Sequence, residues 1–169
     1  MMNLSNVLVV YTKPKTSAEK QTLEVVQNTL KKHEINFSIS EREKLNRKLF
    51  RNKDLVIAVG GDGTFLRASH FIPNKMPILG VNSDPKSKEG FFMASNKKNF
   101  NEIIKKISKN YYKIRKLHRL EAYINSKKIP ELALNEFYIS SAKEYHTARY
   151  YLTLRGKRER QKSSGIIIS

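Results

Sequence analysis

Asp54-Leu55-Val56-Ile57-Ala58-Val59-Gly60-Gly61-Asp62-Gly63-Thr64 is the stretch of sequence that decides the fold. Its first part is a continuous apolar run, which is typical of a strand buried on both faces of a parallel sheet. The run stops at two glycines, and a helical pattern follows over 64–71. A strand, a glycine-rich turn and a helix in this order predict an α/β unit whose ligand site lies at the carboxyl end of the strand.

The residues on either side of this stretch continue the alternation of strands and helices. Thr16 and Glu19 have the spacing of a capping box, which predicts a helix start. Leu45 and Leu49 are the apolar positions of a further, polar helix. The expected elements are strands over 6–11, 37–40 and 76–81 and helices over 17–33, 41–50 and 100–110. This order predicts a doubly wound, mostly parallel α/β domain over residues 1–110.

The pattern changes after residue 110, because strand-like runs then follow one another without helices. We expect strands over 112–124, 129–139, 145–154 and 165–168, with a hairpin turn over 125–128. These runs predict the start of an all-β domain over 111–169. The last run is still apolar where the sequence stops at Ser169, so we expect this β domain to be incomplete and the chain to be truncated.

Composition limits the possible functions. The formal net charge of +18 is compatible with binding to polyanions, but the lysines are spread over the chain, so we do not expect nucleic acid as a partner. No apolar run is long enough to span a bilayer, and no leader pattern precedes the first strand, so we expect a cytoplasmic protein without a membrane partner. The chain has no Cys, and the spacing of His70, His118 and His146 does not suggest a metal site.

The loop over 60–64 contains the residues with the clearest chemical role. Gly61 and Gly63 let a nucleotide approach the backbone closely, and the helix start at Thr64 can face phosphate oxygens. A carboxylate such as Asp62 repels phosphate, but it suits a hydroxyl that must lose a proton, or a Mg²⁺ ion. We therefore interpret Asp62 as a general base for phosphoryl transfer to an alcohol. The alternative is a plain turn in which Asp62 caps the helix.

Gly-Gly-Asp-Gly-Thr resembles the signature loop shared by NAD kinases and by the diacylglycerol and sphingosine lipid kinases. Other segments are similar to NAD kinases in particular, and the longer second glycine segment is closest to the mitochondrial-type enzymes of animals. The segments that carry the resemblance are Phe65-Leu66-Arg67-Ala68, Leu79-Gly80-Val81-Asn82-Ser83-Asp84-Pro85, Glu89-Gly90, Ala133-Leu134-Asn135-Glu136, Ala148-Arg149-Tyr150-Tyr151 and Gln161-Lys162-Ser163-Ser164-Gly165.

The resemblance implies roles for individual residues. Asp62 is expected to act on the 2′-hydroxyl of the adenosine ribose of NAD, while Asn135 and Glu136 contact the nicotinamide riboside side. Asn82 is expected to help close the pocket. Arg67 is one helical turn beyond Gly63, so either a phosphate contact or a surface salt bridge is possible there. Arg149 and Lys162 are weaker candidates for phosphate contacts, and Ser164 replaces the Asp that many family members have.

The resemblance further implies ATP as the phosphoryl donor, NAD as the acceptor, Mg²⁺ on the phosphates and a homo-oligomer. The family pattern continues into a nucleotide-binding loop that is absent here, so this chain alone could be inactive. A lipid kinase remains an alternative, although the Asn-Glu segment does not fit it. A non-catalytic module that binds nucleotide or nucleic acid is the third reading.

Overall fold

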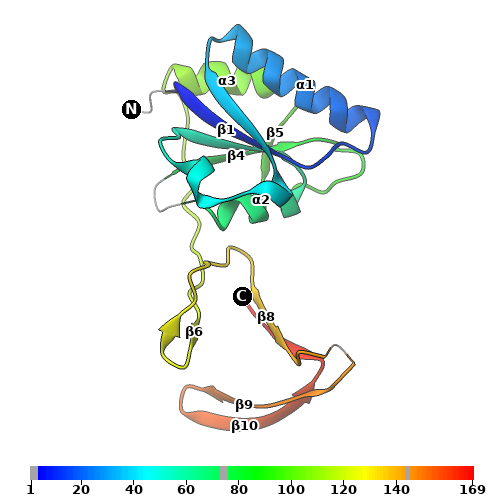
Figure 1. The fold of residues 1–169 in the computed structure, drawn as a ribbon, viewed down its shortest axis with the longest axis vertical. Coiled ribbons are helices and arrows are strands. Elements are labelled where there is room, and N and C mark those ends of the chain that lie inside the picture. Colours follow the sequence, from blue (N-terminus) through cyan, green and yellow to red (C-terminus); the bar gives the residue numbers. More distant parts are fainter. Residues whose placement is uncertain (1–3, 73–75, 144) are drawn as a thin grey trace. The chain divides into compact units, whose positions relative to one another are not determined.

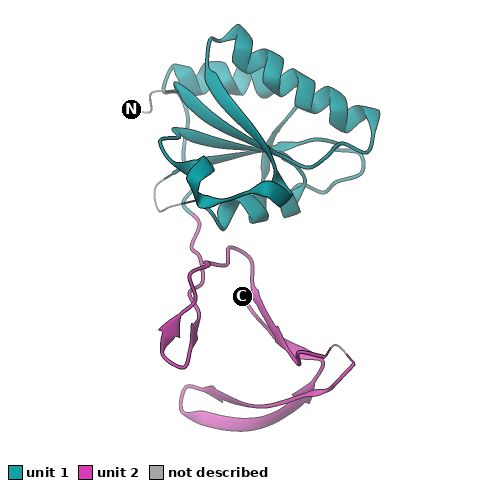
Figure 2. Ribbon diagram, viewed as in Figure 1, with its two compact units in different colours: residues 1–116 teal, residues 117–169 magenta. Residues whose placement is uncertain are grey.

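The computed structural model describes residues 4–72, 76–143 and 145–169, which form two compact units (Figure 2). The first unit is residues 1–116 and the second is residues 117–169. The expected domain boundary after residue 110 falls just inside the first unit and remains a proposal.

A five-stranded parallel sheet forms the centre of the first unit (Figure 1). Its order is β2-β1-β3-β4-β5, and every neighbouring pair is parallel. The strands are β1 (Asn6–Tyr11), β2 (Asn36–Glu41), β3 (Leu55–Gly60), β4 (Ile78–Asn82) and β5 (Met93–Asn96). All six residues of β3 are buried, as the apolar run predicted. The predicted α/β fold class is therefore confirmed.

Helices cover both faces of this sheet. On one face α1 (Ser17–Lys32) and α3 (Phe100–Ser108) pack against alternate residues of β1 and β3. On the other face lie α2 (Asp62–Ser69) and two short 3-10 helices, η1 (Arg42–Lys44) and η2 (Arg47–Phe50). Because successive residues of a strand point to opposite faces, Val9 belongs to the first core and Val10 to the second.

The start of α1 follows the sequence prediction. The Thr16 side chain accepts a hydrogen bond from the backbone N–H of Glu19, and the Glu19 side chain accepts one from the backbone N–H of Thr16. This capping box satisfies two helix-end donors and fixes where α1 begins. It also orients the Glu19 carboxylate, which contributes to the site described below.

Three predictions about the first unit need correction. The single helix expected over 41–50 is instead η1 and η2, because the backbone at Leu45 is extended and Asn46 caps a new turn. Helix α2 begins two residues earlier than expected, since the carbonyl of Gly61 already accepts the N–H of Thr64. Strand β5 was not predicted at all, because it is short and largely polar.

The described residues of the second unit, 117–143 and 145–169, contain three antiparallel strand pairs. The strands are β6 (Tyr123–Ile124), β7 (Lys127–Lys128), β8 (Phe137–Ser140), β9 (Ala148–Leu154), β10 (Lys157–Ser163) and β11 (Gly165–Ile168). The pairs are β6 with β7, β8 with β11, and β9 with β10. The predicted hairpin turn is present: Asn125 and Ser126 both have positive φ, at 49° and 64°. Both residues of a two-residue hairpin turn of type I′ have this conformation.

The strand lengths predicted for the second unit are partly wrong. Of the run expected over 112–124, β6 is paired, Leu120 is bridged to Ala133, and the carbonyl of Ala122 accepts the N–H of Ile129. Of the run expected over 129–139, these two partner residues and the first residues of β8 are paired. Alternating apolar residues indicate an extended backbone but do not specify a partner strand. Strand β10 was missed because all seven of its residues are polar or charged. Among the described residues, no helix has the length and apolarity needed to cross a membrane.

Candidate active site

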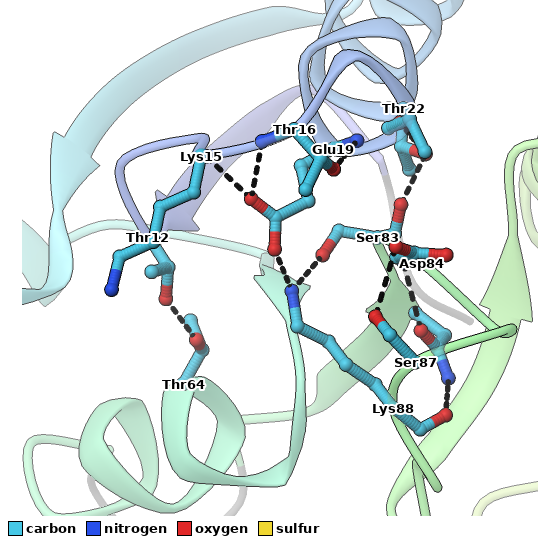
Figure 3. A network of polar contacts seen from close by, with 12 residues as sticks. Thr12, Lys15, Thr16, Glu19, Thr22, Thr64, Ser83, Asp84, Ser87 and Lys88 are labelled. Atoms are coloured by element: carbon cyan, nitrogen blue, oxygen red, sulfur yellow. Dashed lines mark hydrogen bonds and ion pairs between the residues drawn. The ribbon is translucent and has the colours of Figure 1, made fainter.

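The predicted site lies where the strand order of the sheet changes direction. Strands β1 and β3 are neighbours, and the chain leaves them toward opposite sides of the sheet, β1 leading to β2 and β3 leading to β4. Ligands of open α/β sheets bind at the carboxyl ends of strands at such a point. Thr12 follows β1 and Gly61 follows β3, and the Thr12 hydroxyl is hydrogen-bonded to the Thr64 hydroxyl across the gap (Figure 3).

An open depression of about 260 Å³ occupies this edge of the sheet. Four of the five residues of the predicted loop over 60–64 line it, all except Gly60, together with residues from three other parts of the chain. The lining residues are Thr12, Arg42, Gly61, Asp62, Gly63, Thr64, Lys88, Glu89 and Gly90.

Asp62 is the first residue of α2, and its carboxylate is held by two backbone groups. The N–H of Phe91 donates to Oδ2 at 2.9 Å, and the N–H of Phe92 donates to Oδ1 at 2.8 Å. The ring of Phe92 stacks on that of the buried Phe65, with centroids 5.1 Å apart. The carboxylate is therefore fixed in orientation. It still has free lone pairs, because an ionised carboxylate can accept about four hydrogen bonds.

The glycines of the loop differ in how much room the fold leaves for a side chain. A Cβ at Gly60 would lie 2.8 Å from Cβ of Thr64, so the start of α2 leaves no room for one. A Cβ at Gly63 would meet only Nη1 of Arg42, at 3.5 Å, which is an ordinary contact. Gly60 is thus required by packing. Gly63 is not, which is consistent with its predicted place beside a ligand.

Asn82 supports the site from the end of β4, beside Gly60 in the sheet register. Its side chain is buried: Nδ2 donates to the carbonyl of Lys88, and Oδ1 accepts the N–H of Asp84. Both ends of the amide therefore hold the turn over 83–88. The N–H of Ser83 also donates to the carbonyl of Gly60, at 2.9 Å, which ties this turn to the glycine loop. Asn82 is not among the residues that line the depression, and its expected part in closing the pocket remains a prediction.

Lys88 and Glu19 were not predicted from the sequence as site residues. The ammonium of Lys88 forms an ion pair with Glu19 and donates to Oγ of Ser83 at 2.9 Å (Figure 3). Lys88 lowers the pKa of the Glu19 carboxyl by hydrogen bonding to it, and the backbone N–H of Lys15 contributes in the same direction. Glu19 therefore stays ionised at neutral pH. The capping box was the only sequence signal pointing to Glu19.

The two arginines near the loop differ in position. Arg42, which was not predicted, lines the depression beside Gly63 and pairs with Glu43. Arg67, which was predicted, is exposed and is not among the residues that line the depression. Its guanidinium lies 5.4 Å from the ring centroid of Phe71, a cation–π contact. The expected phosphate contact of Arg67 remains a prediction to which the described geometry adds no support.

The remaining predicted residues belong to the second unit. Asn135 and Glu136 are exposed and directly precede β8. Arg149 and Lys162 face each other in the β9–β10 register, and Ser164 lies between β10 and β11. Their roles toward a nucleotide remain predictions.

Within residues 4–72, 76–143 and 145–169, no three His, Asp or Glu side chains are grouped so that they could hold an ion. Mg²⁺ on the nucleotide phosphates, which the resemblance implied, remains a prediction.

The sheet order and the helices on both faces define a three-layer α/β domain with an open depression at the carboxyl ends of its strands. Residues 3–112 match the model of the ATP-NAD kinase N-terminal domain. The chain belongs to the NAD kinase family.

The curated relatives that the chain resembles carry the names of NAD or NADH kinases. The chain is 30% identical over 155 residues to a probable NADH kinase of Oryza sativa subsp. japonica, covering 82% of this chain and 47% of the relative. It is 29% identical over 154 residues to an NAD kinase of Clostridium tetani, and this match covers 89% of this chain and 55% of the relative. The chain is 34% identical over 71 residues to a mitochondrial NAD kinase 2 of Homo sapiens. The match covers 41% of this chain and 16% of the relative. The chain thus spans about half the length of the first two relatives. The predicted resemblance, mitochondrial-type relatives included, is confirmed.

Proposed function

We propose that this chain forms the catalytic-loop part of an enzyme that transfers the γ-phosphoryl group of ATP to the 2′-hydroxyl of the adenosine ribose of NAD. The observation that carries the proposal is the Asp62 carboxylate, which two backbone N–H groups hold at the edge of the depression. The family and the names of the relatives supply the substrates.

In this proposal, Asp62 accepts the proton of the ribose hydroxyl. The O–H bond breaks as the hydroxyl oxygen forms a bond to the γ-phosphorus, and the bond from that phosphorus to the β-phosphate oxygen breaks. The products are NADP and ADP. The amides of Phe91 and Phe92 keep the carboxylate in one orientation, so little reorganisation is needed when the hydroxyl arrives. Magnesium bound to the ATP phosphates would offset their charge.

Asn135 and Glu136 are proposed to contact the riboside on the nicotinamide side of NAD. A homo-oligomer and a cytoplasmic location remain predictions from the sequence.

The acceptor can be tested directly with ATP labelled on the γ-phosphate. The chain is incubated in parallel with NAD and with a diacylglycerol dispersed in detergent. Label recovered in NADP supports the proposal. Label recovered only in the lipid product would replace it by a lipid kinase, which shares the glycine loop.

A further inference from the structure

Lys88 has a position that a purely structural ion pair does not require. Its methylenes lie over the glycine loop, so that a Cβ at Gly61 would be 3.2 Å from the Lys88 Cδ. The side chain lines the depression, yet only 25% of it is exposed. The methylenes of Lys88 are thus beside the backbone where a nucleotide is proposed to bind, and the ammonium lies one bond beyond them.

The backbone of Lys88 is anchored, whereas the end of its side chain can exchange partners. Its N–H donates a hydrogen bond to the carbonyl of Asp84, and its carbonyl accepts one from Nδ2 of Asn82. The ammonium is held by Ser83 and Glu19, which are a hydroxyl and a carboxylate (Figure 3). An ammonium has three donors, so it can bind a phosphate oxygen while it keeps one of these partners.

Acidic residues line the depression, so a phosphate group could bind there only with a cation close by. The lining includes the carboxylates of Asp62 and Glu89 and the cations Lys88 and Arg42. A phosphate group beside Asp62 would be repelled unless a positive charge lay close to it. Arg42 is on the Gly63 side of the loop and Lys88 on the Gly61 side. Lys88 is the better held of the two, since its carboxylate partner Glu19 is 12% exposed whereas Glu43 is 55% exposed.

We propose that Lys88 is a phosphate-binding residue of this site, held by Glu19 in the unliganded chain and donating to a nucleotide phosphate oxygen in the complex. The inference rests on the proposed function and names a residue that the glycine motif does not include. The phosphate belongs either to the diphosphate of NAD or to the triphosphate of ATP.

The test compares Lys88→Met with Glu19→Gln in the full chain. Both substitutions remove the ion pair between α1 and the turn. Met keeps most of the apolar cover over Gly61, and Gln keeps the capping box. Lys86→Ala is the matched control, because Lys86 is an exposed lysine of the same turn that does not line the depression. Calorimetry measures the binding of NAD, of ATP and of adenosine, which has no phosphate.

Lys88→Met should weaken the binding of NAD, of ATP or of both by about tenfold or more, because a hydrogen bond to a charged group is lost. Binding of adenosine should not change. Glu19→Gln should bind the same ligand as tightly as the wild type or more tightly, since it frees the ammonium. A loss confined to NAD would assign Lys88 to the diphosphate, and one confined to ATP to the triphosphate.

Two results would overturn the assignment of Lys88. One is unchanged binding of both nucleotides by Lys88→Met. The other is an equal loss in Lys88→Met and Glu19→Gln, which would show that the ion pair only joins α1 to the turn. A wild-type chain that binds adenosine but neither NAD nor ATP would overturn the proposed function along with it.

Discussion

The backbone nitrogen of Phe92 lies 2.8 Å from Oδ1 of Asp62, although 30 positions separate the two residues in the sequence. The contact joins the start of α2 to the segment that leads into β5. The stack of Phe92 on Phe65 of α2 joins the same two segments. The orientation of the proposed base therefore depends on aromatic packing beside it.

This dependence predicts the effect of removing the Phe92 ring. Phe92→Ala deletes the stack with Phe65 and should lower the free energy of unfolding by about 1–3 kcal/mol, since an aromatic pair contributes beyond its buried area. Phe91→Ala is the control, because it removes a ring that is 77% exposed and its edge contact with Phe92 but leaves the Phe65 stack in place. Urea unfolding measures both. Equal losses would contradict a special role for the Phe65–Phe92 stack.

The two glycines Gly60 and Gly63 should respond differently to a methyl group. Gly60→Ala places a Cβ against Thr64 and should destabilise the fold by about 1–3 kcal/mol through overpacking. Gly63→Ala has room in α2 and should leave the free energy of unfolding unchanged or raise it by up to about 1 kcal/mol.

Nucleotide binding by Gly63→Ala gives the complementary readout. If the ligand approaches the backbone at Gly63, the added methyl should weaken NAD or ATP binding while thermal unfolding stays normal. Wild-type affinity for both nucleotides would show that the ligand does not contact this position.

Two carboxylates should make the fold sensitive to acid. Lys88 lowers the pKa of Glu19 below its ordinary value of 4.5. Burial raises the pKa of Asp54, but hydrogen bonds from Ser5 and Asn6 outweigh it and bring the pKa below 3.8. A carboxyl whose pKa is lowered on folding stabilises the fold above its unfolded-state pKa, and that contribution is lost as pH falls through the folded-state pKa.

We therefore expect the urea midpoint to fall as pH is lowered from 6 through these values. Glu19→Gln and Asp54→Asn should each reduce this fall, because neither replacement titrates. Glu24→Gln makes the same chemical change on the exposed part of α1 and serves as the control. A profile in Glu19→Gln that matches the wild type would contradict the role of the Lys88–Glu19 pair in stability.

The sequence predicted the parts of the fold that depend on local patterns. The apolar run of β3 and the Thr16–Glu19 capping box were both correct, because each is specified within a few residues. The helix over 41–50 was wrong, since the spacing of Leu45 and Leu49 does not reveal the extended backbone at Leu45. Strand β10 was missed because an exposed two-stranded ribbon does not need apolar residues.

In the candidate site, too, residues specified by local sequence could be predicted, and residues brought together by the fold could not. Asp62 could be predicted, since the glycines around it mark a tight turn after a buried strand. Lys88, Glu19 and Arg42 could not, because only the folded sheet brings their segments to one edge. Arg67 stays a prediction: helical spacing placed it one turn beyond Gly63, and in the fold its guanidinium lies over the ring of Phe71.

The central claim is that Asp62 acts in phosphoryl transfer to NAD, and the most direct test is the rate of NADP formation from NAD and ATP by the wild type and Asp62→Asn. Loss of a general base should reduce the rate by about 100-fold or more, while NAD binding stays detectable by calorimetry. Circular dichroism is needed alongside, because the Asn amide cannot accept both backbone N–H groups as the carboxylate does. NADP formation by a folded Asp62→Asn variant at the wild-type rate would contradict the claim.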